Sequence, residues 1–222
     1  MENETKRKTI HILNGLWAFL LAFFPRIVAI SIVIVALIFV FILARPDSLF
    51  GSFFEKSFRY MARDVDIKKG YLFGPSIYVL MVLILVIFVD YRIAGSIFAI
   101  LAFGDGFATV IGRKYGNHKL HNKKTIEGSI AFFSFSLISS LIVFLSINEF
   151  NTPSAGLIIF PFLMLPKLLN INIVNLLIGF IFVTAILTFI ELFIGDIIDD
   201  NVMIPISGSV LLYIVLFVLL EI

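Results

Sequence analysis

The feature that most constrains this chain is a series of apolar runs longer than the core of a soluble domain needs. Residues 30–43, for example, are apolar on nearly every face of a helix. In lipid a spanning segment must satisfy its own backbone hydrogen bonds, which a helix of about 20 residues does. A transmembrane β-barrel would instead alternate apolar and polar residues in stretches of about 10. The sequence therefore predicts an all-α, polytopic membrane bundle in which residues 1–222 form one domain.

The composition supports this class and excludes others. Hydrophobic residues make up 60% of the 222 residues and charged residues only 14%, whereas soluble domains carry about 25% charged residues. The chain has no Cys, which excludes thiol nucleophiles and thiolate metal sites. A net charge of +2 gives no reason to expect a nucleic-acid partner.

We expect about seven membrane spans. The apolar runs lie near residues 9–24, 27–44, 71–89, 93–111, 128–147, 173–194 and 203–220. The first run lacks a small-residue cleavage pattern and is interpreted as a retained span. Residues 154–169 are ambiguous, because sixteen helical residues reach roughly 24 Å and a bilayer core is roughly 30 Å thick. If that segment crosses, the number of spans is eight.

Most of the 17 Lys and Arg residues lie in three segments, residues 6–8, 45–69 and 113–124. Alternating spans place all three on one side of the membrane, and the positive-inside rule makes that side cytoplasmic. We therefore expect an integral membrane protein with a cytoplasmic N-terminus and cytoplasmic loops at residues 45–70 and 112–127.

The first of these loops contains aromatic residues at helical spacing. Phe50, Phe54, Phe58 and Met61 would share one face of a helix, which is typical of an amphipathic helix at a membrane surface. The alternative is a solvated linker that happens to contain aromatic residues.

The first cluster of polar residues follows the fourth apolar run. On a helix, a stripe without large side chains lies beside a stripe of polar ones. The small stripe consists of Gly104, Ala108, Gly112 and Gly116, and the polar stripe of Asp105, Thr109 and Arg113. A carboxylate suits a divalent cation and a guanidinium suits phosphate oxygens. The alternative is a small-xxx-small contact between two helices.

The cluster continues into the next apolar run. Its residues are His118, Lys119, His121, Lys123, Lys124, Thr125, Glu127, Gly128 and Ser129. The last four open a predicted helix, and a helix N-terminus favours anions. With the cations of the loop, this is a candidate cradle for a triphosphate. A basic loop that only fixes topology or contacts anionic lipid is the alternative, and the two histidines are interpreted as solvated.

Further polar residues lie near the two ends of the chain. The C-terminal group comprises Glu191, Asp196, Asp199, Asp200 and Asn201. Such acids repel one another unless a cation neutralises them, and Mg²⁺ bound by one or two carboxylates and nucleotide phosphates fits this composition. An acidic turn is the alternative. Near the N-terminus, Arg7, His11 and Asn14 stand at helical spacing, and a structural role for His11 is as plausible as a functional one.

Together these residues resemble the motifs of the CTP-dependent lipid-alcohol kinases. That family comprises phytol kinase, dolichol kinase and the CTP-dependent diacylglycerol kinase, and is related to the CDP-lipid synthases. The similar segments are, in chain order, Arg7-Lys8-x-x-His11; Gly104-Asp105, Ala108, Gly112-Arg113 and Gly116; Lys124-Thr125-x-Glu127-Gly128-Ser129; and Glu191, Asp200-Asn201 and Pro205. Thr125 stands where Ser is commoner in the family, and the acidity at Asp196 and Asp199 is additional.

The resemblance implies transfer of the γ-phosphoryl group of CTP to the hydroxyl of a membrane lipid. The sites we expect are a nucleotide and phosphate site (Gly104, Gly112, Arg113, Lys123, Lys124, Thr125, Gly128, Ser129), a Mg²⁺ site (Asp105 with Asp199 or Asp200), a catalytic base (Asp105 or Glu127), and four residues of undefined role (Arg7, His11, Glu191, Asn201). This scheme requires both clusters on the cytoplasmic face, and therefore favours seven spans.

The resemblance leaves the acceptor open. An isoprenoid alcohol such as a polyprenol, dolichol, phytol or geranylgeraniol is favoured, and diacylglycerol is an alternative. A cytidylyltransferase that makes CDP-lipid, or a membrane transporter, would also fit parts of the pattern. The sequence leaves open whether the chain forms a homo-oligomer.

Overall fold

The computed structural model describes residues 2–47, 50–120, 124–150, 172–194 and 199–219. Within these ranges the regular structure is helical, apart from one isolated bridge between Lys119 and Thr125. The all-α prediction is therefore confirmed. The elements are α1 (Glu2–Asn14), α2 (Leu16–Leu20), α3 (Arg26–Ile38), η1 (Phe39–Leu43), α4 (Ser52–Met61), α5 (Asp64–Lys69), α6 (Phe73–Phe88), α7 (Tyr91–Ala99), η2 (Ile100–Gly104), α8 (Asp105–Tyr115), α9 (Ile126–Phe150), α10 (Ile173–Ile194) and α11 (Asp200–Leu219).

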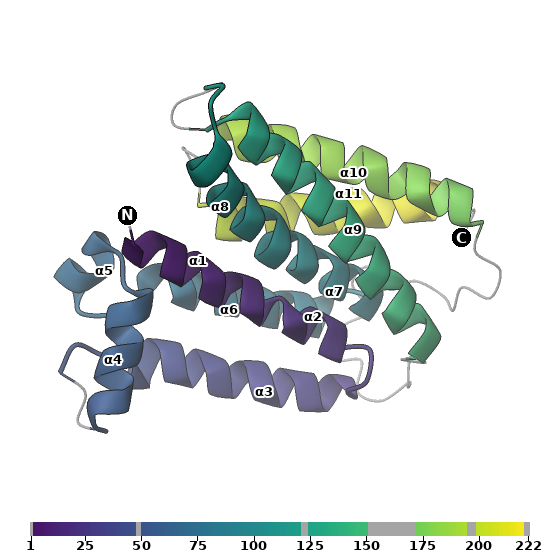
Figure 1. Cartoon of the computed structure of the whole chain (residues 1–222). Coiled ribbons are helices and arrows are strands. Elements are labelled where there is room, and N and C mark those ends of the chain that lie inside the picture. The colour runs from purple at the N-terminus through teal and green to yellow at the C-terminus, as the bar shows by residue number, and fades with distance from the viewer. Residues whose placement is uncertain (1, 48–49, 121–123, 151–171, 195–198, 220–222) are drawn as a thin grey trace.

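The centre of the bundle is the continuous helix formed by α7, η2 and α8. Every residue from Tyr91 to Ala102 is buried, as expected for a helix that other helices surround on all sides. Helices α2, α6, α9 and α11 pack around it, and α1 lies against its C-terminal half, whereas α10 packs on α9 and α11 (Figure 1). The central helix therefore holds Asp105, its first polar residue after the buried stretch, against several neighbours.

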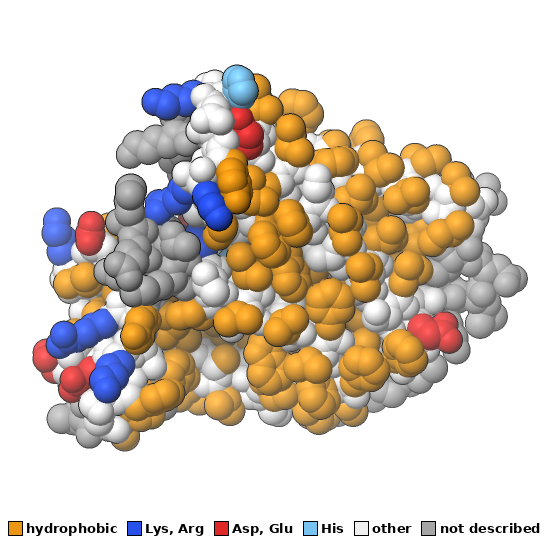
Figure 2. Space-filling view, viewed as in Figure 1, with side chains coloured by type: hydrophobic (Ala, Val, Ile, Leu, Met, Phe, Trp, Pro, Cys, Tyr) orange, Lys and Arg blue, Asp and Glu red, His pale blue; other side chains and the backbone are white. Residues whose placement is uncertain are grey.

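Four helices in the described part of the chain are long and apolar enough to cross a membrane. They span Tyr91–Tyr115, Ile126–Phe150, Ile173–Phe193 and Asp200–Val218. On the face that Figure 2 shows, hydrophobic side chains cover the body of the molecule. The exposed hydrophobic residues include Ile138 on α9 and Ile178 on α10. A surface of this kind suits lipid rather than water.

Three of the predicted spans correspond to shorter helices. The run at residues 27–44 forms α3 and η1, and the run at 71–89 forms α6. The run at 9–24 is divided between α1 and α2 at Gly15. A Cβ atom at Gly15 would lie 2.6 Å from the Phe103 ring and 2.9 Å from the Ala102 Cβ, so the absence of a side chain lets α1 approach the central helix. The ambiguous segment 154–169 lies outside the described residues.

The helix predicted near residues 50–61 forms as α4, with an amphipathic pattern. Phe58 is only 2% exposed and packs with Val40, Ala44 and Leu72, whereas Phe50 and Phe53 are exposed. The buried side of α4 therefore packs on the rest of the protein, while Phe50 and Phe53 stay on its surface.

Helices α9 and α10 are antiparallel, which defines two ends of the bundle. The rings of Phe144 and Phe180 lie 5.4 Å apart near the middle, and Lys124 pairs with Glu191 at one end. The N-terminus, α4 and α5 lie toward that same end (Figure 1). Most of the charged side chains visible on this face also gather there (Figure 2). We call it the polar end.

Candidate functional site

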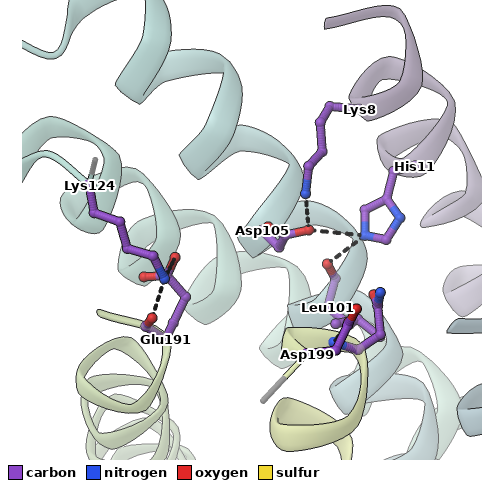
Figure 3. A network of polar contacts seen from close by, with 8 residues as sticks. Lys8, His11, Leu101, Asp105, Lys124, Glu191 and Asp199 are labelled. Carbon is purple, nitrogen blue, oxygen red and sulfur yellow. Dashed lines mark hydrogen bonds and ion pairs between the residues drawn. The ribbon is translucent and has the colours of Figure 1, made fainter. Parts of the chain in front are cut away.

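The polar end contains a buried ion pair between α1 and the central helix. The ammonium group of Lys8 donates a hydrogen bond to Asp105 Oδ2, and His11 Nε2 lies 3.5 Å from the same oxygen (Figure 3). Lys8 and Asp105 are 7% and 8% exposed. Burying a charge is costly unless it is paired, so the ammonium group of Lys8 holds the Asp105 carboxylate in place, with the His11 ring beside it.

A π-helical segment precedes Asp105. Segment η2 ends at Gly104, and His11 Nε2 lies 3.0 Å from the carbonyl oxygen of Leu101 within it. Because a carbonyl oxygen only accepts hydrogen bonds, Nε2 carries the proton in this contact. Short π-helical segments within α-helices occur frequently at functional sites. Here the segment supplies the carbonyl that orients His11 beside Asp105.

The second ion pair joins the loop before α9 to the end of α10. Lys124 Nζ lies 2.7 Å from Glu191 Oε1 and also donates to the Glu191 carbonyl. Glu191 lies in an apolar helix, and its charge is neutralised by Lys124, a residue of the predicted nucleotide and phosphate site. Glu191 of the C-terminal acidic group and Lys124 of the basic loop therefore lie at the same end of the bundle. A nucleotide site that combines residues of both groups requires this.

The acids before α11 have distinct roles. Asp199 caps the helix, because its Oδ1 accepts the Asn201 N–H at 2.9 Å. Asp200 interacts electrostatically with both Asp105 and Glu191, and its Oδ1 is buried without a hydrogen-bond partner among the described residues. Asp196 lies outside the described residues.

The described acids do not form a complete Mg²⁺ site by themselves. No group of three or more His, Asp or Glu side chains in the described part of the chain is placed to hold a metal ion by itself. Mg²⁺ commonly binds through one or two carboxylates together with substrate phosphates. The unpartnered oxygen of Asp200, close enough to Asp105 for their charges to interact, fits such a shared site rather than a protein cage.

Three residues of the predicted nucleotide and phosphate site, Gly112, Thr125 and Gly128, form a close contact between α8 and α9. A Cβ atom on Gly112 would lie 3.3 Å from the Gly128 Cα, and one on Gly128 would lie 3.1 Å from the Ala108 carbonyl. The Thr125 hydroxyl accepts the Gly128 N–H at 3.1 Å, which caps α9. The small residues Gly112 and Gly128 thus form a helix contact, as one of the two interpretations predicted. This contact holds the N-terminus of α9 beside the C-terminal half of α8.

The other candidate residues between Arg113 and Ser129 differ in their surroundings. Glu127 Oε1 lies 2.7 Å from His118 Nδ1 and accepts the Asn117 N–H at 3.2 Å, so it is directed at the exposed loop. Arg113 is exposed, and the Ser129 hydroxyl is buried without a partner among the described residues. Lys123 and His121 lie outside the described residues.

A small polar pocket lies beside the Lys8–Asp105 pair. Its polar lining residues come from α1, α6, α8, α11 and the segment between α4 and α5: they are Arg7, Lys8, His11, Asn14, Arg63, Tyr78, Asp105 and Asn201. The pocket has a volume of about 60 Å³, room for about two water molecules at roughly 30 Å³ each. It can take a hydroxyl or one phosphoryl group, whereas the rest of a nucleotide would lie outside it.

An apolar groove adjoins the polar pocket. It has a volume of about 590 Å³ and runs between α1, α2, α3, α4 and α6. Asn14 and Tyr78 line both cavities. Trp17 and Val35 line the groove and are exposed, so the groove opens on the apolar outer surface.

The sequence pattern missed two residues of this site. Arg63 lies in a predicted cytoplasmic loop, and its charge alone did not distinguish it from the other basic residues there. Tyr78 was hidden in an apolar run, although a phenol within an otherwise aliphatic helix is the signal that could have indicated it.

Comparison with known proteins does not extend these observations. No family model, curated protein or solved structure matches the chain.

Proposed function

We propose that this chain is a membrane-bound kinase that transfers the γ-phosphoryl group of CTP to the hydroxyl of a lipid alcohol. The observation that carries the proposal is the convergence of four distant motif segments at the polar end. Lys8 contacts Asp105, Lys124 contacts Glu191, and Asn201 at the start of α11 lines the same pocket as Lys8 and Asp105. The choice of CTP rests on the motif resemblance alone.

The chemistry of the site is compatible with phosphoryl transfer. Such transfer depends on positioning the reactants and neutralising phosphate charge. The polar pocket is lined by three basic side chains, those of Arg7, Lys8 and Arg63, and Lys124 and Arg113 lie toward the same end. These cations would bind the triphosphate, and Asp105 with Asp200 would hold Mg²⁺ against its oxygens.

The acceptor would approach from the bilayer. In the reaction the lipid oxygen forms a bond to the γ-phosphorus, the bond from that phosphorus to the bridging β-oxygen breaks, and CDP leaves. Asp105 is the better placed of the two candidate bases, because it lines the polar pocket while Glu127 is directed at His118. The proton of the lipid hydroxyl would pass to Asp105 as Lys8 turns toward the phosphates.

Seven spans, with the polar end cytoplasmic, fit this proposal. The antiparallel packing of α9 on α10 leaves Phe150 and Ile173 at the other end of the bundle from Lys124 and Glu191. The basic loops then lie on the side that the positive-inside rule makes cytoplasmic.

The test uses purified protein in lipid micelles with Mg²⁺ and a panel of phytol, geranylgeraniol, polyprenol and diacylglycerol. CTP is supplied with label on either the γ- or the α-phosphorus. Label reaching the lipid only from the γ position is the expected result. Label arriving only from the α position, on an added lipid phosphate, would instead identify a cytidylyltransferase.

Two variants make the test specific to the site. D105N is expected to lower the rate of transfer at least 100-fold, a typical effect of losing a catalytic acid or base. D64N, which alters an exposed carboxylate on α5, is the matched control and should retain the wild-type rate. Equal rates in the two variants would overturn the assignment of Asp105.

A further inference from the structure

The hydroxyl of Tyr78 is a buried polar group that is unpaired within the described part of the chain. The side chain is 5% exposed, and its Oη makes no hydrogen bond with any described residue. Buried polar groups in proteins are almost always hydrogen-bonded, because leaving one unsatisfied costs the desolvation of that group without any return. An exception of this kind points to a ligand that completes the hydrogen bond.

The position of Tyr78 identifies where that ligand would lie. Its ring packs 4.5 Å from the ring of His11 and 5.8 Å from that of Phe98, which fixes its orientation. Tyr78 lines both the apolar groove and the polar pocket that contains Asp105. A molecule with one polar end and one apolar chain, placed across this junction, would bring its polar end to the phenol.

The volume of the groove limits the apolar part. Protein pockets that hold one small-molecule ligand have volumes of about 300–1,000 Å³, and the groove, with about 590 Å³, lies within this range. A lipid with two long chains is roughly twice as bulky as one with a single chain, so we take a single chain as the occupant of the groove.

From these observations we infer that Tyr78 binds the hydroxyl of a single-chain lipid alcohol whose chain lies in the groove between α3 and α1–α2. Asn14 on α1 is the other polar residue that lines both cavities at this junction. The inference deepens the proposed function, since it identifies the class of acceptor and the residue that selects it. It rests on that function only for the subsequent reaction and not for the binding step.

The experiment measures binding without nucleotide. Trp17 is the single Trp of the chain and lines the groove, so its fluorescence reports on the groove directly. Protein in detergent micelles is titrated with a brominated C20 alcohol, which quenches Trp17, and separately with the brominated C20 hydrocarbon that lacks the hydroxyl. Because a neutral hydrogen bond contributes about 0.5–1.5 kcal/mol, we expect the alcohol to bind about 3- to 10-fold more tightly than the hydrocarbon.

The variants separate the hydroxyl from the chain. Y78F keeps the packed ring and should remove the advantage of the alcohol while leaving hydrocarbon binding unchanged. Y60F removes a second phenol that also lines the groove but is exposed, and it should behave as the wild type. A36F fills part of the groove and should weaken binding of both compounds.

Two results would overturn the inference. One is Y78F binding the alcohol as tightly as the wild type does. The other is a brominated diacylglycerol that quenches Trp17 at the same mole fraction as the single-chain alcohol. Selective binding of the alcohol without transfer of phosphate from CTP would leave this inference standing and reject the proposed kinase, so the two failures are distinguishable.

Discussion

Lys8 and Asp105 are 97 positions apart in the chain, yet the ammonium group of Lys8 is hydrogen-bonded to the Asp105 carboxylate inside the bundle. The pair ties α1 to the central helix at the edge of the polar pocket. A contact of this kind has consequences for stability as well as for function, and the two can be measured separately.

Removing the cation of this pair should destabilise the protein. K8M removes the cation that is hydrogen-bonded to the buried Asp105 carboxylate, and we expect a loss of about 3 kcal/mol in the free energy of unfolding, the lower end of the range for broken buried pairs. The measurement is unfolding in mixed micelles with increasing sodium dodecyl sulfate. K56M, on the exposed face of α4, is the control and should change stability by less than about 0.5 kcal/mol. The double variant K8M/D105N should regain part of the loss, and a K8M protein as stable as the wild type would contradict the expectation.

The close packing of α8 on α9 predicts opposite effects for two Gly-to-Ala substitutions. In G128A the new methyl group would lie 3.1 Å from the Ala108 carbonyl oxygen, a backbone atom that can move only with its helix, so we expect a loss of about 1–3 kcal/mol. In G74A the nearest atoms, 3.7 Å away, belong to the side chain of Arg63. There the better helix propensity of Ala should give a gain of about 0.5–1 kcal/mol. Equal thermal unfolding midpoints in the two variants would show that the two helices are not in close contact.

A buried ion pair at the other end of the bundle should affect stability alone. Asp90 accepts hydrogen bonds from the Arg92 backbone N–H, Nε and a terminal nitrogen at 2.9–3.0 Å, and Arg92 also donates to Asn148 at 3.0 Å. D90A should lower the free energy of unfolding by about 3–5 kcal/mol, because it leaves a guanidinium buried. At a temperature where the variant is folded, its equilibrium affinity for CTP should equal that of the wild type. A lower affinity would indicate that this end contributes to the nucleotide site.

The topology can be tested with single cysteines, because the chain contains none of its own. We expect K56C and K119C, both at exposed positions of the polar end, to react with a membrane-impermeant maleimide from the same side of a sealed vesicle. E149C, at the end of α9, should react only from the other side. Labelling of K56C and K119C from opposite sides would exclude the arrangement of the helices described above.

Much of the architecture follows from the sequence because hydrophobicity and helix formation act locally. The four longest spans each begin and end within a few residues of the predicted boundaries, since an apolar run determines both the helix and its burial. Thr125 caps α9 as the pattern at residues 125–129 indicated. Interruption of the first run at Gly15 could not be predicted, because it depends on the ring of Phe103 nearly 90 residues later.

The sequence predicts which residues belong to the candidate site better than it predicts which of them contact one another. The sequence identifies Asp105, Lys124 and Glu191 as costly in a membrane, but it does not say which cation meets which carboxylate. Glu127, which the motif made a candidate base, is instead directed at His118 by a turn of the loop. Contacts of this kind depend on the three-dimensional arrangement of helices that are distant in sequence.

The apolar groove opens sideways past Trp17 and Val35. This opening determines which concentration sets the rate at which an acceptor enters the groove. Such a molecule would diffuse in two dimensions and need never cross into water. Its encounter rate would depend on its mole fraction in the surrounding leaflet, so that adding inert phospholipid would slow the reaction even though the total amounts of acceptor and protein stay the same.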